Sequence, residues 1–222
     1  IVLVTKKDGT TRFCVDYRQL NASTVKDSYP LPNIEDTLDS LAGARYFCAL
    51  DLASGYWQVP LSEDAKPKTA FMTKTGLYEF NVMPFGLCNA PATFERLMER
   101  VLRGHIGNRC LVYLDDIIVY GKSFAETLDN LEHVFARLSE AGLKVKPSKC
   151  SLFREELLYL GFYITGTSIR PDPKKLAAVK NWPVPCSVHD LRVFLGFSNY
   201  HRRFINGFAS IAAPLTALTK KV

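Results

Sequence analysis

The sequence lacks an apolar run long enough to span a membrane, and no secretory signal opens it, so no membrane partner is expected. It has no Cys-x-x-Cys pair, and its six cysteines and four histidines are scattered without the spacing of a metal site. This pattern argues against a disulfide framework or a zinc site and favours reduced core cysteines in a cytosolic protein. No low-complexity segment is present.

The chain has 222 residues, of which 47% are hydrophobic. That is enough apolar material for the core of one or two domains. The first residues, Ile1 to Val4, already read as a strand, and we expect the natural chain to begin upstream. The sequence is therefore expected to be a fragment.

Positive charge is concentrated in the C-terminal third. The net charge is +6, but residues 1–143 carry 15 Lys and Arg against 18 Asp and Glu, whereas residues 144–222 carry 13 against 4. Aromatic residues are interspersed there: Phe194, Phe197, Tyr200, Phe204 and Phe208. Ordinary solvation accounts for single lysines, but a one-sided excess of this size favours a surface that follows a phosphate backbone.

Strand and helix signals alternate without a repeat. Segments 1–7 and 11–17 are strand-like and joined by Asp8-Gly9, a hairpin signal. Helices are predicted from the apolar spacing that begins at Ile34, from the start signal Asn89-Ala90-Pro91, and from the spacing that ends at Gly142. The residues that define the faces of these helices are Ile34, Leu38 and Leu41; Phe94, Leu97, Met98 and Val101; and Leu128, Leu131, Val134, Phe135 and Leu138.

Further strands are predicted over 46–50, over 110–120 as a hairpin, and over 151–165 as a pair, followed by short helices between prolines. Mixed strands and helices with hairpins indicate an α+β fold and not a doubly wound parallel sheet.

Tyr113-Leu114-Asp115-Asp116 places two adjacent carboxylates inside an apolar run. In one interpretation Asp115-Asp116 is a solvated two-residue turn, although such turns favour Gly or Asn at the second place. In the other the two side chains bind a divalent cation, which offsets the cost of withdrawing carboxylates from water. The segment alone leaves both interpretations open.

Asp51 follows a short apolar strand and precedes Gly55 and two bulky aromatics. A helix N-cap is the commoner role for such an aspartate. One aspartate at the end of a strand together with an Asp-Asp hairpin, in a basic chain, is nevertheless what a two-metal phosphoryl-transfer site requires.

An ordered set of motifs covers nearly the whole chain and resembles the polymerase region of reverse transcriptases, most closely those of Ty3/gypsy-type long-terminal-repeat retrotransposons. The motifs are Lys6-Lys7-Asp8-Gly9, Arg12, Val15-Asp16-Tyr17-Arg18-Gln19-Leu20-Asn21, Leu50-Asp51-Leu52, Gly55-Tyr56-Trp57-Gln58, Met83-Pro84-Phe85-Gly86-Leu87-Cys88-Asn89-Ala90-Pro91, Tyr113-Leu114-Asp115-Asp116, Lys146-Pro147-Ser148-Lys149-Cys150 and Tyr159-Leu160-Gly161.

The resemblance implies a right-hand polymerase with an antiparallel palm sheet backed by helices. Fingers are expected over 1–26 and 59–89, a palm over 27–58 and 90–168, and a thumb-like segment over 169–222. The RNase H domain that usually follows in this family is expected to be absent from these residues.

The resemblance also implies that Asp51, Asp115 and Asp116 are the catalytic triad and hold two Mg²⁺ or Mn²⁺ ions, with Asp51 and Asp115 as the main ligands. Lys6 and Arg12 would hold the β- and γ-phosphates of the nucleotide, and Lys149 would protonate the leaving pyrophosphate, although a plain surface lysine is nearly as good an interpretation of Lys149.

Tyr56 would lie beneath the sugar and leave no room for a 2′-hydroxyl, which favours deoxynucleotides; the alternative is a packed core tyrosine. Phe85 and Gly86 would line the nucleotide pocket, with Phe85 at a place where retroviral members usually carry Gln.

The remaining predicted contacts are with the template-primer. They are Tyr113 in the hairpin, the segment Leu158, Tyr159, Leu160 and Gly161 at the primer end, and Arg202 and Arg203, which lie with Tyr200 and Phe204 in an expected helix.

The predicted activity is RNA-directed and DNA-directed DNA synthesis in retrotransposon replication. The predicted partners are an RNA/DNA template-primer duplex, a dNTP, and either a second copy of the chain or adjoining RNase H and integrase regions of a polyprotein. The predicted location is a cytoplasmic retroelement particle, with nuclear entry of the replication complex. Two rivals stay open: a domesticated or subunit-type binding copy without catalysis, and an RNA-dependent RNA polymerase, against which Tyr56 is the main argument.

Overall fold

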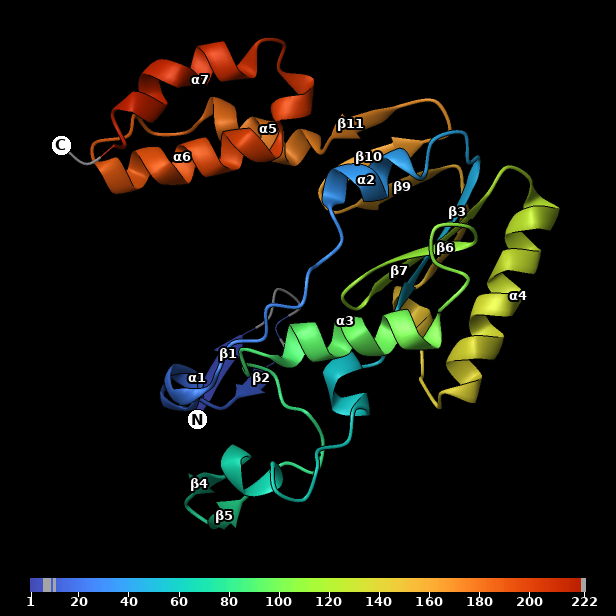
Figure 1. Cartoon of the computed structure of the whole chain (residues 1–222), viewed down its shortest axis with the longest axis vertical. Coiled ribbons are helices and arrows are strands. Elements are labelled where there is room, and N and C mark those ends of the chain that lie inside the picture. Colours follow the sequence, from blue (N-terminus) through green and yellow to red (C-terminus); the bar gives the residue numbers. More distant parts are fainter. Residues whose placement is uncertain (6–8, 10, 221–222) are drawn as a thin grey trace. The chain divides into compact units, whose positions relative to one another are not determined.

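The computed structural model describes residues 1–5, 9 and 11–220, except for the side chains of residues 12 and 180. The chain divides into two compact units, Ile1–Glu155 and Glu156–Val222. The elements of both are labelled in Figure 1. The fingers, palm and thumb ranges given above stay predictions, because this division follows packing alone.

A four-stranded antiparallel sheet in the order β6-β7-β3-β8 forms the centre of the first unit. Its strands are β3 (Tyr46–Asp51), β6 (Cys110–Tyr113), β7 (Asp116–Gly121) and β8 (Ser151–Arg154). The predicted hairpin over 110–120 is therefore confirmed. Its two turn residues are Leu114 and Asp115, however, and not Asp115 and Asp116, because Asp116 already pairs with Tyr113 as the first residue of β7.

Helices α3 (Ala90–Val101) and α4 (Phe124–Glu140) supply apolar side chains to a core shared with alternate residues of β3, β6 and β7. Figure 1 shows both helices beside these strands. The predicted core residues Phe94, Met98, Val101, Leu131, Val134 and Leu138 are buried. Leu128 and Phe135, expected on the same face of α4, are 40% and 36% exposed, because the buried stripe of α4 is narrower than the apolar pattern.

Smaller elements complete the first unit. The predicted N-terminal hairpin is confirmed as β1 and β2, paired from Val2 opposite Cys14 to Thr5 opposite Thr11. The predicted helix at Ile34 is confirmed as α2, and both Leu38 and Leu41 are 1% exposed. The smaller elements of this unit are β1 (Val2–Thr5), β2 (Thr11–Cys14), α1 (Arg18–Ser23), α2 (Ile34–Asp39), η1 (Gly55–Gln58), η2 (Lys66–Thr69), β4 (Phe71–Thr73), β5 (Gly76–Tyr78) and η3 (Pro147–Lys149).

The second unit pairs a three-stranded antiparallel sheet, in the order β11-β10-β9, with helices. Its elements are β9 (Glu156–Tyr159), β10 (Phe162–Thr165), β11 (Ile169–Pro171), α5 (Pro173–Lys180), α6 (Val188–Tyr200), η4 (Arg202–Phe204) and α7 (Phe208–Ala217). The strand pair expected over 151–165 is wrong as a single pair. Residues 151–154 join the four-stranded sheet, and only 156–165 form a hairpin of their own.

The α+β class is confirmed by these helices and antiparallel sheets. Within the part of the chain that the structure describes, no helix combines the length and apolar character that crossing a membrane would need.

Candidate active site

The register between β3 and β7 brings two of the predicted catalytic carboxylates together. Asp51, the last residue of β3, is directly opposite Asp116, the first residue of β7. Directly opposed residues of an antiparallel pair have Cβ atoms about 4.5–5.5 Å apart and project from the same face. The N-cap interpretation of Asp51 is therefore wrong: its backbone belongs to the ladder of the sheet.

The third carboxylate, Asp115, occupies the turn that joins β6 to β7. The other turn residue, Leu114, has a φ of 58°, in the left-handed region. A leucine in that conformation costs about 1–2 kcal/mol, and the turn has no glycine to avoid this cost. The backbone N–H of Leu114 donates to Oε2 of Glu95 at 2.6 Å, which ties the turn to helix α3.

The three carboxylates interact electrostatically. Partial withdrawal from water raises the pKa of Asp116, and the charges of Asp115 and Asp51 raise it further, whereas Lys149 lowers it. Asp116 is exposed, so burial does not fully separate its carboxylate from water. The two neighbouring carboxylates are therefore the cause of the raised pKa that is particular to this site. Excess negative charge is thus concentrated at this end of the sheet.

Lys149 lies against this cluster. Its Nζ donates to Oδ2 of Asp51 at 3.2 Å, from the short helix η3. The chain before η3 is held beside β3 because the N–H of Lys146 donates to the carbonyl of Asp51 at 2.8 Å. The sequence motif around Lys149 therefore reaches the carboxylates, as a partner of Asp51.

Tyr56 and Phe85, predicted to line the nucleotide pocket, lie against each other with ring centroids 5.4 Å apart. Tyr56 also contacts the core ring of Phe94 at 5.4 Å, so the packed-tyrosine interpretation holds for one side of the ring. Burial raises the pKa of Tyr56, and the charges of Asp115 and Glu95 raise it further. Trp57 is 44% exposed and contacts Phe85 as well.

Gly55 allows this close packing. A Cβ atom built on it would lie 3.0 Å from Cζ of Phe94 and 3.5 Å from Cβ of Asp115. Any larger residue would therefore displace the ring of Phe94 or the turn that carries Asp115. The glycine allows η1 to pack closely against both α3 and this turn.

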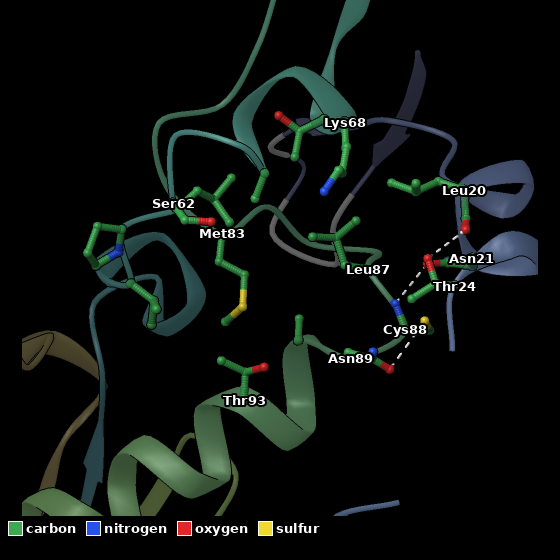
Figure 2. Close-up of a pocket in the computed structure, with 16 residues that line it drawn as sticks. Leu20, Asn21, Thr24, Ser62, Lys68, Met83, Leu87, Cys88, Asn89 and Thr93 are labelled. Carbon is green, nitrogen blue, oxygen red and sulfur yellow. Dashed lines mark hydrogen bonds between the residues drawn. The ribbon is translucent and has the colours of Figure 1, made fainter. Parts of the chain in front are cut away.

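The loop that carries Gly86 is held by Asn21, a residue to which the sequence assigned no role. Its Nδ2 donates to the carbonyl of Gly86 at 2.8 Å, and its Oδ1 accepts from the N–H of Cys88 at 2.9 Å. Figure 2 shows Asn21 facing Cys88 beside a cavity of about 260 Å³ with a mostly apolar lining. Asn21 is the last residue of the motif Val15-Asp16-Tyr17-Arg18-Gln19-Leu20-Asn21, and membership of that motif was the one sign in the sequence that it has a role.

Asn89, expected to start helix α3, is its N-cap residue, but its side chain makes no capping hydrogen bond. Its side chain instead donates to the carbonyl of Val25 at 2.9 Å and accepts from the N–H of Asp27 at 3.0 Å. Asn21, in α1, binds the loop before α3 to that helix, and Asn89 binds the start of α3 to the segment that follows α1.

The predicted phosphate-binding pair lies at the limit of the description. Lys6 is outside the described residues, and of Arg12 the backbone alone is described, in β2 opposite Val4. Neighbouring Phe13 contacts the ring of Phe71 at 5.3 Å. The roles of Lys6 and Arg12 stay predictions.

The predicted template-primer residues fall in both units. Tyr113 ends β6 opposite Asp116 in the first unit. In the second unit, Tyr159 is buried and Leu158 exposed on β9, while Leu160 and Gly161 form the turn to β10 with φ values of 49° and 80°.

Arg202 and Arg203 are exposed and belong to η4, also in the second unit. The helix expected to contain them together with Tyr200 and Phe204 is wrong in extent. Helix α6 ends at Tyr200, and the chain turns at His201 before the short helix η4 begins.

The donor set suits a hard divalent cation, although it is not a closed cage. Among the described residues, no group of three or more His, Cys, Asp or Glu side chains gathers closely enough to hold a metal ion. Mg²⁺ is usually held by one or two carboxylates together with substrate phosphates, so an open carboxylate cluster with excess negative charge fits it.

Comparison with known proteins agrees with this arrangement. The model of the family "Reverse transcriptase (RNA-dependent DNA polymerase)" matches residues 4–164. The chain is 44% identical over 210 residues to the Retrovirus-related Pol polyprotein from transposon 297 of Drosophila melanogaster, covering 95% of this chain and 20% of that polyprotein. It is 33% identical over 221 residues to the Transposon Tf2-3 polyprotein of Schizosaccharomyces pombe, covering 100% of this chain and 17% of that polyprotein.

Solved structures give the same result. The foamy viral protease-reverse transcriptase dRH in complex with double-stranded DNA matches with a TM-score of 0.86 at 31% identity, over 97% of this chain and 38% of that one. The foamy viral protease-reverse transcriptase in complex with an RNA/DNA hybrid matches with a TM-score of 0.79 at 31% identity, over 98% and 29%.

The chain spans about a fifth of the length of the polyproteins it matches. The family model covers most of the chain, including Asp51 and the turn with Asp115, and the resemblance to Ty3/gypsy-type elements is confirmed. This chain belongs to the reverse transcriptase (RNA-dependent DNA polymerase) family.

Proposed function

We propose that this chain catalyses RNA- and DNA-templated DNA synthesis, transferring a nucleotide from a dNTP to the 3′-hydroxyl of a primer with the help of two Mg²⁺ or Mn²⁺ ions. The observation that carries the proposal is the pairing of Asp51 with Asp116 beside the turn that presents Asp115. Strand register, and not a flexible loop, holds two of the three carboxylates together.

Asp51 and Asp115 would be the main metal ligands, with Asp116 a less direct partner. When bound, the cations lower the pKa of the primer hydroxyl and neutralise charge on the triphosphate and the leaving pyrophosphate. The cluster would attract cations because its carboxylates lie close together: burial, followed by the charges of Asp115 and Asp51, raises the pKa of Asp116. Lys149, which pairs with Asp51, would be the proton donor to pyrophosphate.

Tyr56 would select the sugar. Its ring packs against those of Phe85 and Phe94, and the preceding residue, Gly55, lies against Asp115, where a nucleotide bound to the carboxylates would place its sugar. Packing against two rings hinders Tyr56 from moving away from a 2′-hydroxyl, so the clash would not be relieved by rearrangement. This supports deoxynucleotide use and disfavours the RNA polymerase alternative.

Primer extension on poly(rA)/oligo(dT) tests the activity. We expect incorporation of dTTP that requires Mg²⁺ or Mn²⁺, and little incorporation of UTP. Asp51→Asn should lower the rate at least about 1,000-fold, because it removes a metal-binding charge with little change of shape. Asp129→Asn is the matched control, since Asp129 pairs with Arg109 on the surface of α4. Absence of both dTTP and UTP incorporation by the wild-type chain would leave only the non-catalytic binding copy, and incorporation of UTP in place of dTTP would favour the RNA polymerase.

Tyr56→Val tests the sugar gate separately. We expect the ratio of UTP to dTTP incorporation to rise roughly 10- to 100-fold, because the smaller side chain opens space for a 2′-hydroxyl. Tyr56→Phe keeps the ring and loses only the phenol, so it should keep the wild-type ratio. An unchanged ratio in Tyr56→Val refutes the gate without affecting the metal-site proposal.

The partners we propose are an RNA/DNA template-primer duplex, a dNTP, and adjoining RNase H and integrase regions of a polyprotein, with a second copy of the chain as the alternative. The matched relatives are polyproteins, and the matched foamy viral structures are complexes with double-stranded DNA or an RNA/DNA hybrid. Sedimentation of the chain with and without a duplex distinguishes a monomer from a dimer.

A further inference from the structure

Glu95 is a buried acid on a helix face that is otherwise apolar. It follows Phe94 and precedes Met98 by three residues on α3, and all three side chains are 0% exposed. A carboxylate withdrawn from water is costly unless it is paired. Among the described residues no lysine or arginine forms an ion pair with Glu95, and its Oε1 has no hydrogen-bond partner. Core packing alone does not require a carboxylate here.

The other carboxylate oxygen has one specific partner. Oε2 of Glu95 accepts the backbone N–H of Leu114 at 2.6 Å. Leu114 is the turn residue with a φ of 58° and directly precedes Asp115. The hydrogen bond therefore stabilises the conformation that a leucine adopts least readily.

The surroundings of Glu95 also contact the turn. Its neighbour Phe94 packs against Tyr56 and lies beneath Gly55, whose position is limited by Phe94 and by Cβ of Asp115. Burial raises the pKa of Glu95 to about 6, and Glu99, one helical turn further on, raises it as well, whereas the Leu114 bond lowers it. One turn of α3 thus supports both Asp115 and Tyr56.

We propose that Glu95 is a positioning residue that fixes the Leu114–Asp115 turn, and with it the two carboxylates of the hairpin, through its hydrogen bond to the Leu114 N–H. This role rests on the proposed DNA synthesis and deepens it. In this role Glu95 is not required to contact the nucleotide or the metals. It acts through the backbone of the turn.

Glu95→Gln and Glu95→Met separate the acceptor from the packing. Glutamine keeps an acceptor oxygen in place, whereas methionine fills similar space without one. We expect kcat for dTTP incorporation to fall about 10- to 100-fold in Glu95→Met, because small displacements of catalytic groups are that costly, with KM for dTTP and Kd for the template-primer within about threefold of wild type. Glu95→Gln should stay within about threefold in all three. Glu99→Gln is the control on the same helix, since Glu99 accepts a hydrogen bond from Tyr29 and not from the turn.

A second measurement needs no metal and no activity. Amide hydrogen exchange at Leu114 in metal-free protein should accelerate at least about 10-fold in Glu95→Met and stay near the wild-type rate in Glu95→Gln. If Glu95→Met does not fold, Glu95→Asp takes its place, because the shorter side chain withdraws the acceptor. A wild-type kcat in the variant that lacks the acceptor, or equal losses in the glutamine and methionine variants, overturns the positioning role. Inactivity of the wild-type chain would instead be a failure of the proposed function.

Discussion

Hairpins β6–β7 and β9–β10 enter their turns through the same residue pair, Tyr-Leu, but the residue that follows the leucine and the contacts that hold the turn differ. Tyr113-Leu114 and Tyr159-Leu160 each end a strand and enter a two-residue turn, and both leucines have positive φ, 58° and 49°. In the second hairpin the next residue is Gly161, with a φ of 80°, as expected for a tight turn with left-handed residues at both places. In the first hairpin the corresponding residue is Asp115.

The partners of the two turns differ as well. The carbonyl of Leu160 accepts from the hydroxyl of Tyr200, and the carbonyl of Gly161 accepts from the N–H of Asp172 at 3.0 Å. The Leu114 turn is instead held from its N–H side by the buried carboxylate of Glu95. In the β9–β10 turn Gly161 meets the preference for a left-handed residue at the second place, although Leu160 still has positive φ at the first. In the β6–β7 turn the second place carries the carboxylate of Asp115, and the left-handed Leu114 is held by a tertiary hydrogen bond to its N–H.

Asp115→Gly tests this difference most severely, because it gives the β6–β7 turn the residue type of Gly161. We expect dTTP incorporation to fall at least about 1,000-fold, since a proposed metal ligand is lost. The free energy of unfolding, measured in urea without divalent metal, should stay the same or rise, because the repulsion felt by Asp116 is reduced. A variant that keeps more than about a hundredth of the wild-type rate would mean that Asp115 serves the turn and not the reaction.

Much of this site could be predicted because its signals are local. An apolar strand ending in Asp51 and a hairpin with two carboxylates are visible in the sequence, and the structure pairs Asp51 with Asp116 as the two-metal hypothesis needs. The position of the turn could not be predicted, since a leucine is disfavoured at positive φ unless a distant group compensates for it. That group, Glu95, is 19 residues away along the chain.

The division of residues 151–165 was missed for a related reason. Both β8 and β9 are short, and nothing in their composition distinguishes a strand that pairs with β3 from one that pairs with β10. Pairing of distant strands is decided by packing of the whole unit, which local patterns do not contain. A sign of Glu95 was present, however, as an acid within the apolar spacing of Phe94, Met98 and Val101.

The pH dependence of stability in Glu95→Gln tests whether the β6–β7 turn is held by a buried carboxyl group. Burial raises the pKa of Glu95 from its ordinary value of 4.5 to about 6, so between these values the folded chain holds a proton that the unfolded chain has lost. Folded stability therefore falls as pH rises through this window, by up to about 2 kcal/mol. We expect this fall to be absent from Glu95→Gln, as measured by urea unfolding of both proteins from pH 4 to pH 8. Parallel curves for the two proteins would show that the carboxyl is solvated.

Gly161→Ala examines the glycine turn. Alanine at a φ of 80° is strained, although the nearest atom to the added Cβ, Cε1 of Tyr200, is 3.9 Å away. We expect a loss of about 1 kcal/mol, measured by chemical unfolding. Gly196→Ala is the matched control, because Gly196 lies inside α6 with open space around it and should gain about 0.5–1 kcal/mol. Equal effects in the two variants would show that turn conformation is not the cause.

Tyr200→Phe removes the hydroxyl bond to the Leu160 carbonyl and should have the smallest effect. The ring keeps its stacked contact with Phe162, at 5.1 Å between centroids, and water can replace the hydroxyl at a partly exposed turn. We expect a loss of about 0.5–1 kcal/mol in urea unfolding, as for an ordinary neutral hydrogen bond. A loss above about 2 kcal/mol would instead mean that the β9–β10 turn depends on a tertiary contact as strongly as the β6–β7 turn does, and the glycine would not account for the difference between the two hairpins.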